Sequence, residues 1–351
     1  MALINLKTQD FQSLEAALVP AQASRVAALK VFASVFAHQA QNMADVRNAK
    51  QVPAGVRDWV QANAELPSLE IVERRKADDG FVKYLFSSPA GGRFEAVRIP
   101  IFEDKYIVCV SSQVGCALAC DFCMTGKMGF KRNLEAWEII DQVLQIRREA
   151  DRPVRGIVFM GMGEPLLNFN ESTKAARVMC HPAGLAISSK SITFSTAGWV
   201  PGIRRYIAEE VPYRLAFSIT SAIAEKRVQV LPVEKTWPLA TLVDEIRTYA
   251  ITRRERAMLA YVMISGFNTG REDAEALAQT FAGIPVKIDL IDVTDPTGKY
   301  QPPGAEELAA FRDHLQVVKA PIARRYSGGK DIGAACGTLD ASQRGGVLFG
   351  A

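Results

Sequence analysis

The chain has 351 residues, of which 48% are hydrophobic and 23% are charged, and its formal net charge is +4. This length and composition allow one large domain and a smaller one, and they exclude a chain too polar to bury a core. The mild positive charge permits RNA binding without arguing for it. We expect a cytoplasmic protein with no membrane segment, because the sequence contains neither the regions of a signal peptide nor an apolar run of membrane-spanning length.

The first residues, 1–67, predict a small helical accessory domain. Apolar residues recur at helical spacing over 24–37, and a second helix is expected over 56–60, after Pro53 and Gly55. Such a bundle packs only on its own core or also contacts substrate, and the sequence leaves both readings open.

Residues 68–105 change to strand patterns and predict a connecting β-hairpin extension. Its strands are expected over 81–86 and 94–99, on either side of a turn-forming stretch at 87–92. Glu95 lies in the second strand, where a Glu is usually a solvated surface residue.

Residues 106–351 alternate between strand and helix patterns and form the predicted core of the protein. Strands are expected over 106–111, 155–161, 190–195, 213–219, 257–264 and 286–292, with helices near 134–149, 170–180, 199–209, 237–251, 270–282 and 305–317. Six β/α units predict a parallel sheet but are too few for a closed eight-stranded barrel. We therefore predict an α/β fold with a partial, open (β/α)6 barrel of the TIM type, whose site lies at the carboxyl ends of the strands.

The most informative stretch follows the first of these strands. Cys116, Cys120 and Cys123 occur within eight residues at C-x3-C-x2-C spacing. Structural zinc usually needs four ligands in two separated pairs, and no second C-x-x-C pair is present. An iron–sulfur cluster held by three cysteines would leave one iron open for a small molecule. The spacing therefore favours a [4Fe-4S] cluster over zinc or over unligated thiols.

Candidate ligand-binding residues end the next three strands. Gly163 and Glu164 end the second, Ser195 ends the third, and residues 218–220 end the fourth. Because all of these ends meet on the face that carries the cysteine loop, we expect them to bind a ligand together. Glycine allows a close backbone approach, and Glu164 can accept hydrogen bonds from an ammonium group. The hydroxyl groups have a simpler alternative role as helix caps.

Two further cysteines lie outside the loop and are interpreted differently. Cys336 occurs in the Gly-rich stretch 327–339, where a thiol can reach into a site and react, although a structural role is equally compatible with the pattern. Cys180 ends a predicted helix, and we interpret it as structural because free cysteines are often simply buried.

Taken together, these residues resemble the RlmN/Cfr family of radical S-adenosylmethionine (SAM) RNA methyltransferases. The resemblance covers about residues 80–345 and rests on the cysteine loop, on 159–166, on Cys109 seven residues before Cys116, and on Ala335-Cys336-Gly337. It implies that Cys116, Cys120 and Cys123 hold a [4Fe-4S] cluster whose open iron chelates SAM. It also implies SAM contacts from Gly163, Glu164, Ser195, Ser218, Ile219 and Thr220.

The chain departs from the family pattern at two strand ends. The family's Ser-Leu-His is Ser218-Ile219-Thr220 here, so the histidine is lost. The family's Pro-Trp-Asn-Pro is replaced after the sixth strand, and Thr294 or Asp295 is the candidate counterpart of its SAM-contacting Asn. These departures suggest a divergent member of the family.

The resemblance also implies roles for three residues in the chemistry. Cys336 would accept a methyl group from a first SAM, and a radical made from a second SAM would take hydrogen from that methyl group. The carbon would then add to adenine, with Glu95 at the position of the proton acceptor, and Cys109 would release the product by forming a disulfide with Cys336. Radical addition suits the C2 carbon of adenine, which is not nucleophilic.

We therefore predict a monomeric RNA methyltransferase that acts on adenosine, at C2, in 23S rRNA, with tRNA as a second candidate substrate and a reductant protein such as flavodoxin as a partner. Three alternatives stay open. They are a Cfr-like C8 methyltransferase, a radical SAM enzyme with another substrate, and a non-catalytic, metal-stabilised RNA-binding module, which would be a colourless zinc protein.

Overall fold

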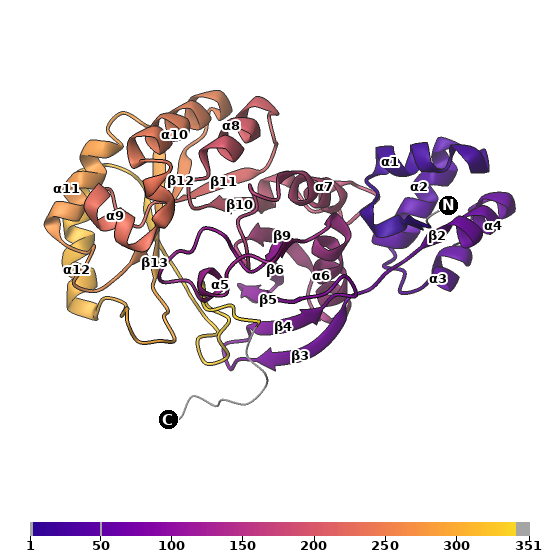
Figure 1. The fold of residues 1–351 in the computed structure, drawn as a ribbon, viewed down its shortest axis with the longest axis horizontal. Helices are drawn as coiled ribbons and strands as arrows, with labels where there is room; N and C mark the ends of the chain where they lie inside the picture. The colour runs from indigo at the N-terminus through magenta and orange to yellow at the C-terminus, as the bar shows by residue number, and fades with distance from the viewer. Residues whose placement is uncertain (1–2, 50, 342–351) are drawn as a thin grey trace.

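The computed structural model describes residues 3–49 and 51–341, and four helices gather at one end of it (Figure 1). They are α1 (Phe11–Ala17), α2 (Arg25–Phe36), α3 (Met43–Arg47) and α4 (Ala54–Asn63). Asp10 and Ser24 cap α1 and α2 by accepting hydrogen bonds from the backbone N–H groups of Ser13 and Ala27. The two predicted helices are therefore present. A short parallel pair, β1 (Ile4–Asn5) with β2 (Ala64–Glu65), was not predicted.

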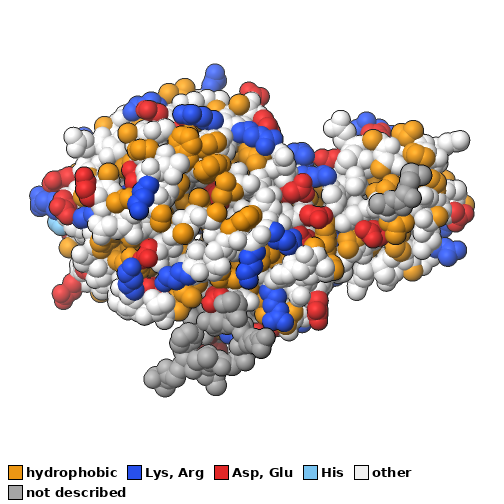
Figure 2. All heavy atoms as spheres, viewed as in Figure 1, with side chains coloured by type: hydrophobic (Ala, Val, Ile, Leu, Met, Phe, Trp, Pro, Cys, Tyr) orange, Lys and Arg blue, Asp and Glu red, His pale blue; other side chains and the backbone are white. Residues whose placement is uncertain are grey.

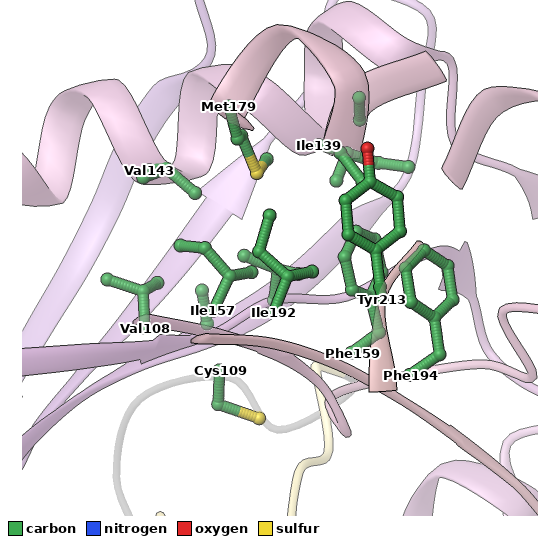
Figure 3. Packing of buried hydrophobic residues seen from close by; sticks show 14 of the residues in the cluster. Val108, Cys109, Ile139, Val143, Ile157, Phe159, Met179, Ile192, Phe194 and Tyr213 are labelled. Atoms are coloured by element: carbon green, nitrogen blue, oxygen red, sulfur yellow. The ribbon is translucent and has the colours of Figure 1, made fainter. Parts of the chain in front are cut away.

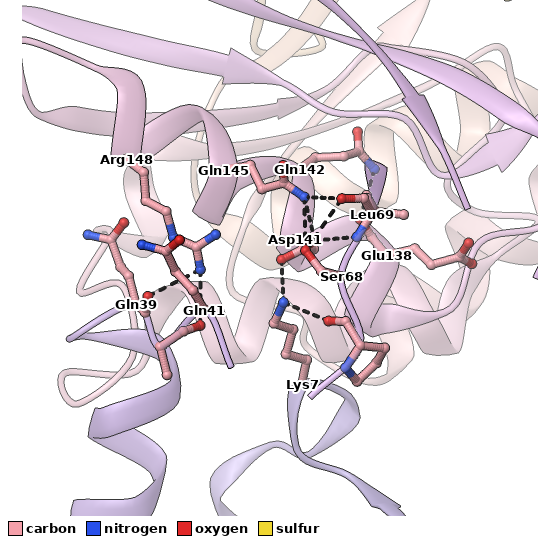
Figure 4. Close-up of polar contacts among 12 residues, drawn as sticks. Lys7, Gln39, Gln41, Ser68, Leu69, Glu138, Asp141, Gln142, Gln145 and Arg148 are labelled. Carbon is pink, nitrogen blue, oxygen red and sulfur yellow. Dashed lines mark hydrogen bonds and ion pairs between the residues drawn. The ribbon is translucent and has the colours of Figure 1, made fainter. Parts of the chain in front are cut away.

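A buried ion pair joins this helical part to the rest of the chain (Figure 4). Lys7, in a 3-10 turn before α1, donates to Asp141 Oδ1 over 2.6 Å, and both side chains are fully buried. Asp141 lies on α6 (Ala136–Glu149), and its other oxygen accepts the backbone N–H of Leu69 over 2.8 Å. The contact fixes where the helical part meets the α/β part.

The remaining chain forms one ten-stranded sheet, in the order β14-β13-β12-β11-β10-β9-β6-β5-β4-β3. The predicted hairpin is present as β4 (Val82–Ser87) and β5 (Arg93–Ile101), with β3 (Glu70–Lys76) beside it, and these strands are antiparallel to their neighbours. The six predicted parallel strands are confirmed as β6 (Lys105–Cys109), β9 (Val154–Phe159), β10 (Ile192–Thr196), β11 (Arg214–Ser218), β12 (Ala257–Met263) and β13 (Val286–Asp292).

A seventh parallel strand, β14 (Ile322–Arg325), pairs with β13 and was not predicted. Half of its four residues are arginines, so its sequence lacks the apolar run of a buried strand. Among the described strands, the two at the edges of the sheet, β14 and β3, do not pair with each other. No strand pairing closes the sheet within the described residues, which agrees with the predicted partial barrel.

Helices cover the outer face of the sheet, each close to its predicted position. They are α6, α7 (Phe169–Cys180), α8 (Val200–Ala208), α10 (Leu239–Arg253), α11 (Arg271–Thr280) and α12 (Ala305–His314). Val108, Ile157 and Ile192 point from the strands toward Val143 and Met179 on this helical layer (Figure 3). Because strand side chains alternate between faces, Cys109 points to the opposite, inner face.

The inner face carries a second, smaller apolar cluster, formed by residues of β12 and β13 and of the segments that follow them, together with residues 230–233. Val262, Ile264, Ile291 and Val293 belong to it, and Leu118 and Phe122 of the cysteine loop lie against them. In the space-filling view, hydrophobic side chains are spread over this part of the molecule and Lys and Arg side chains are scattered around them (Figure 2). No helix in residues 3–49 and 51–341 has the length and apolar character needed to cross a bilayer.

Candidate active site

The cysteine loop, residues 116–123, crosses the carboxyl end of the barrel after β6. Its centre is anchored at Asp121, whose N–H donates to the carbonyl of Val230 over 3.0 Å. The Asp121 carboxylate accepts hydrogen bonds from Lys299 Nζ and the Tyr300 hydroxyl, each over 2.5 Å. The loop is therefore tied to both the fourth and the sixth strand ends.

The three thiols of this loop are half-buried and close enough to influence one another. Loss of water contact raises the pKa of Cys116 to about 12 and that of Cys120 well above its ordinary value. The neighbouring thiols and Glu164 add to both increases. Thiolates that are poorly solvated in this way would be stabilised strongly by a bound cation, and metal ligation requires the thiolate form.

Gly163 and Glu164 follow β9 and contact the next strand end. Gly163 has φ +98°, and a Cβ there would lie 2.5 Å from Cβ of Gln113, so only glycine fits. Glu164 is 3% exposed, and its carboxylate accepts the backbone N–H groups of Leu166 over 3.1 Å and of Ala197 over 2.9 Å. Burial nevertheless raises the pKa of Glu164 to about 7. A cationic ligand beside it would keep this carboxylate ionised.

The ends of β10, β11 and β13 bring hydroxyl groups to the same end of the barrel. Ser195 and Ser218 are half-buried at the ends of β10 and β11, and Ile219 and Thr220 are fully buried just beyond. Thr220 has φ +56°, which is strained for a β-branched residue. The buried hydroxyl groups of Thr220 and Thr294 have no hydrogen-bond partner among the described residues. Asp295, in contrast, already accepts hydrogen bonds from Thr297 and from the N–H of Tyr300.

The loop that carries Cys336 is bound to the two residues that directly follow the cysteine loop. The N–H of Met124 donates to the carbonyl of Gly337 over 2.8 Å, and the Thr125 hydroxyl donates to that of Leu339 over 2.8 Å. Cys336 itself is exposed, and it lines a cavity of about 250 Å³ together with Cys109, Met160 and Leu339. The structure therefore brings the two predicted reactive thiols to one cavity beside the three predicted ligands.

Cys109 is almost fully buried in this cavity wall, with 7% of its surface exposed. Burial, and then the neighbouring Cys336, raise the pKa of Cys109, while the N–H of Met160 and the guanidinium of Arg325 act in the opposite direction. The neutral thiol is therefore the resting form, and any nucleophilic role requires help in forming the thiolate.

Glu95 is buried, contrary to the usual position of a Glu on a strand. It is 4% exposed, pairs with Lys83 over 3.0 Å, and accepts the N–H of Asp340 over 2.8 Å. Burial raises its pKa, and Lys83 opposes that shift. Among the described residues that line the cavity of the two thiols, Glu95 is absent, and its contact with the Cys336 loop is the hydrogen bond from the N–H of Asp340.

Comparisons with known proteins agree with this arrangement. The Radical SAM superfamily matches residues 110–230, which include the cysteine loop. A probable RNA methyltransferase of Myxococcus xanthus (strain DK1622) is 69% identical over 99% of this chain and 97% of its own length. The dual-specificity RNA methyltransferase RlmN of Syntrophobacter fumaroxidans is 41% identical over 81% of this chain and 87% of its own length.

The chain belongs to the RlmN/Cfr family of radical SAM RNA methyltransferases. Its fold agrees with that of a radical SAM methyltransferase from Sphaerobacter thermophilus, with a TM-score of 0.89, 32% identity, and coverage of 97% of this chain and all of the other. Members of this family use a [4Fe-4S] cluster and SAM, so both cofactors are expected here.

The residues present fit these two cofactors of the RlmN/Cfr family. Within 3–49 and 51–341, no three Cys, His, Asp or Glu side chains converge on the position of a single metal ion. A cluster does not need such convergence, because each cysteine binds a different iron atom. For SAM, the unpartnered buried hydroxyl groups of Thr220 and Thr294 provide open contacts that a polar ligand would complete.

Arg227 is a residue of the site that sequence reasoning missed. It lies fully buried on α9 (Ala224–Val230) and donates to the carbonyl groups of Ala197, Ser218 and Ile219 over 3.1, 3.0 and 2.5 Å. Its Nε pairs with Glu234 over 2.8 Å. Arg227 therefore fastens the ends of β10 and β11 together, and nothing in the spacing of a lone Arg in a polar helix signals this.

Proposed function

We propose that this protein methylates the C2 carbon of an adenosine in 23S rRNA, with tRNA as a second candidate substrate. The observation that carries the proposal is the cavity shared by Cys109 and Cys336, next to the loop of Cys116, Cys120 and Cys123. When bound, the cluster and SAM supply a radical that abstracts hydrogen. The chain's own residues would then carry the methyl carbon, bind the adenine base and accept the proton that the base loses.

Each residue has a distinct proposed role. Cys116, Cys120 and Cys123 bind the cluster, while Gly163, Glu164, Ser195, Ser218, Ile219 and Thr220 contact SAM. Thr294 is preferred to Asp295 as a further SAM contact, because its hydroxyl is unpartnered whereas the Asp295 carboxylate already binds Thr297 and Tyr300. Cys336 carries the methyl carbon, and Cys109 is the thiol that displaces the product from it.

The proposed proton acceptor, Glu95, needs a rearrangement to act. Its carboxylate faces the backbone of the Cys336 loop through Asp340, outside the wall of the shared cavity. A shift of this loop on binding RNA would open a path between the carboxylate and the base. The largely apolar wall of the cavity suits a flat ring that has left its stack.

The setting of the reaction is part of the same proposal. Residues 1–67 act as an accessory domain, 68–105 as the connecting extension and 106–351 as the catalytic core. The protein works in the cytoplasm as a monomer, with a reductant such as flavodoxin.

The decisive experiment is nucleoside mass spectrometry of 23S rRNA and tRNA after incubation with the anaerobically reconstituted protein, SAM and a reductant. We expect 2-methyladenosine from the wild type, no product from Cys336→Ala with the visible cluster absorbance intact, and a covalent protein–RNA adduct from Cys109→Ala. Cys180→Ser, at the end of α7, is the matched control and should behave as the wild type. Appearance of 8-methyladenosine would establish the C8 alternative, and SAM cleavage without any methylated RNA would indicate another substrate.

A further inference from the structure

One charged side chain enters the wall of the cavity that Cys109 and Cys336 share. The lining is otherwise formed mainly by aliphatic groups such as Val97, Ile107 and Ile291, and Arg325 of β14 is its only charged member among the described residues. A cation in a mostly apolar wall acts strongly on nearby groups, because little water screens it.

Two contacts hold the Arg325 guanidinium at this position. Its Nε pairs with Asp289 of the neighbouring β13 over 2.9 Å, and its NH1 lies 3.4 Å from the sulfur of Met160. Met160 directly follows β9 and also lines the cavity, and its backbone N–H, like the guanidinium of Arg325, favours the thiolate form of Cys109. Arg325 and Met160 therefore line the cavity of this thiol from the ends of two strands, β14 and β9, that are not neighbours in the sheet.

The chemistry proposed for Cys109 needs such support. Disulfide exchange proceeds from the thiolate, and a thiol that is 7% exposed ionises poorly. The groups acting on Cys109 are Cys336, which disfavours the thiolate, and the Met160 N–H and Arg325, which favour it. Tyr326 also lines the cavity, and its hydroxyl is bound to Asp79.

We propose that Arg325 is a positioning residue that stabilises the thiolate of Cys109 while it attacks the sulfur of Cys336, an inference that rests on the proposed function. In this step a bond forms between the two sulfur atoms and the bond from the Cys336 sulfur to the methylene carbon breaks. The electron pair of that bond moves to the carbon, which takes up one proton and becomes the methyl group of the product. A small-molecule dithiol then reduces the disulfide for the next turnover.

Arg324, the preceding residue, provides a matched control. It also pairs with an aspartate of β13, Asp292, over 2.7 Å, but its side chain does not line the cavity of the two thiols in the described structure. Loss of either arginine removes one cross-strand ion pair, so a purely structural role predicts the same effect for both. A role in supporting Cys109 predicts an effect for Arg325 alone.

The first measurement is the rate of alkylation of Cys109 by iodoacetamide between pH 6 and 11, followed by peptide mass spectrometry of the cluster-loaded protein in a Cys336→Ser background. Arg325→Met should slow alkylation about tenfold at pH 8, as a shift of about one pKa unit implies, and should move the curve to higher pH. Arg325→Lys should restore most of the rate, and Arg324→Met should leave it unchanged. Equal curves for Arg325→Met and Arg324→Met would overturn the inference.

The second measurement uses native Cys336 and an RNA substrate. Arg325→Met should accumulate the covalent protein–RNA adduct, as Cys109→Ala does, whereas Arg324→Met should not. Visible absorbance of the cluster reports whether each variant is folded. If Arg325→Met does not fold, Arg325→Lys is the variant to compare with the wild type, because it keeps the positive charge. If the wild type forms neither product nor adduct, the proposed function fails, while the alkylation curves still decide whether Arg325 supports Cys109.

Discussion

Replacing Lys7 by Met should strongly destabilise the junction between the N-terminal helices and the α/β part. Lys7 Nζ binds Asp141 over 2.6 Å and the carbonyl of Pro67 over 2.7 Å, with no exposed surface on either charged side chain (Figure 4). Methionine matches the length of the lysine stem but leaves the Asp141 charge without its cation.

The size of the effect follows from what remains around Asp141. Removing one partner of a buried ion pair typically costs about 3–5 kcal/mol, because the other charge stays buried. Asp141 keeps its hydrogen bonds from the N–H of Leu69 and from Gln145, each over 2.8 Å, so we expect the lower end, about 3 kcal/mol. Arg74→Met is the control, because the Arg74–Glu149 pair is substantially exposed and such pairs contribute about 0–1 kcal/mol.

Urea denaturation of the purified proteins, monitored by tryptophan fluorescence, measures this difference. Trp59 on α4 and Trp137 on α6 report on the two sides of the junction, so a separate early transition of the helical part is also detectable. The double variant Lys7→Met/Asp141→Met should recover part of the loss, since it removes the orphaned charge. If Lys7→Met and Arg74→Met lower the free energy of unfolding equally, within about 0.5 kcal/mol, the buried pair contributes no more to stability than the exposed pair does.

Three further predictions concern the site. The pKa of Glu164 rises from 4.5 to about 7 on folding, so the folded state holds an extra proton between these values and the free energy of unfolding should fall as pH rises across them. Urea titrations should show a loss of about 2.5 kcal/mol from this group between pH 5 and pH 8 in the wild type and none from it in Glu164→Gln. Arg227→Met leaves Glu234 and three carbonyl groups without their donor, which should cost about 3–5 kcal/mol and weaken SAM binding in equilibrium dialysis, and normal values for both would contradict its bridging role. Gly163→Ala should lower the melting temperature more than Gly266→Ala, because both have positive φ but only a Cβ at 163 meets Gln113; equal shifts would exclude the clash.

The sequence predicted the parallel half of the fold well and the antiparallel half only in outline. Alternating apolar strands and amphipathic helices are local patterns, so the six parallel strands from β6 to β13 and the six long helices around them were found close to their observed bounds, whereas short elements such as α9 were not predicted. The arginine-rich β14 gave no such pattern, because its place in the sheet depends on pairing with β13. The three clustered cysteines were visible through spacing alone. Arg227 and Lys83 were not, since each acquires its role from partners that only the folded chain brings within reach.

The site also divides between the two halves of the sheet. The parallel strands β9 to β13 present Glu164, Thr220 and Thr294, the residues proposed to contact SAM, at one end of the barrel. The antiparallel extension, through Lys83 and Glu95, holds the loop that carries the second reactive thiol. Cys109 sits at the boundary, because β6 pairs in parallel with β9 on one side and antiparallel with β5 on the other. Under the proposed function, the radical forms at the ends of the parallel strands, and the methyl carbon passes from Cys336 to the base next to Cys109. The change of strand direction at β6 therefore places the site of radical formation beside the site of carbon transfer.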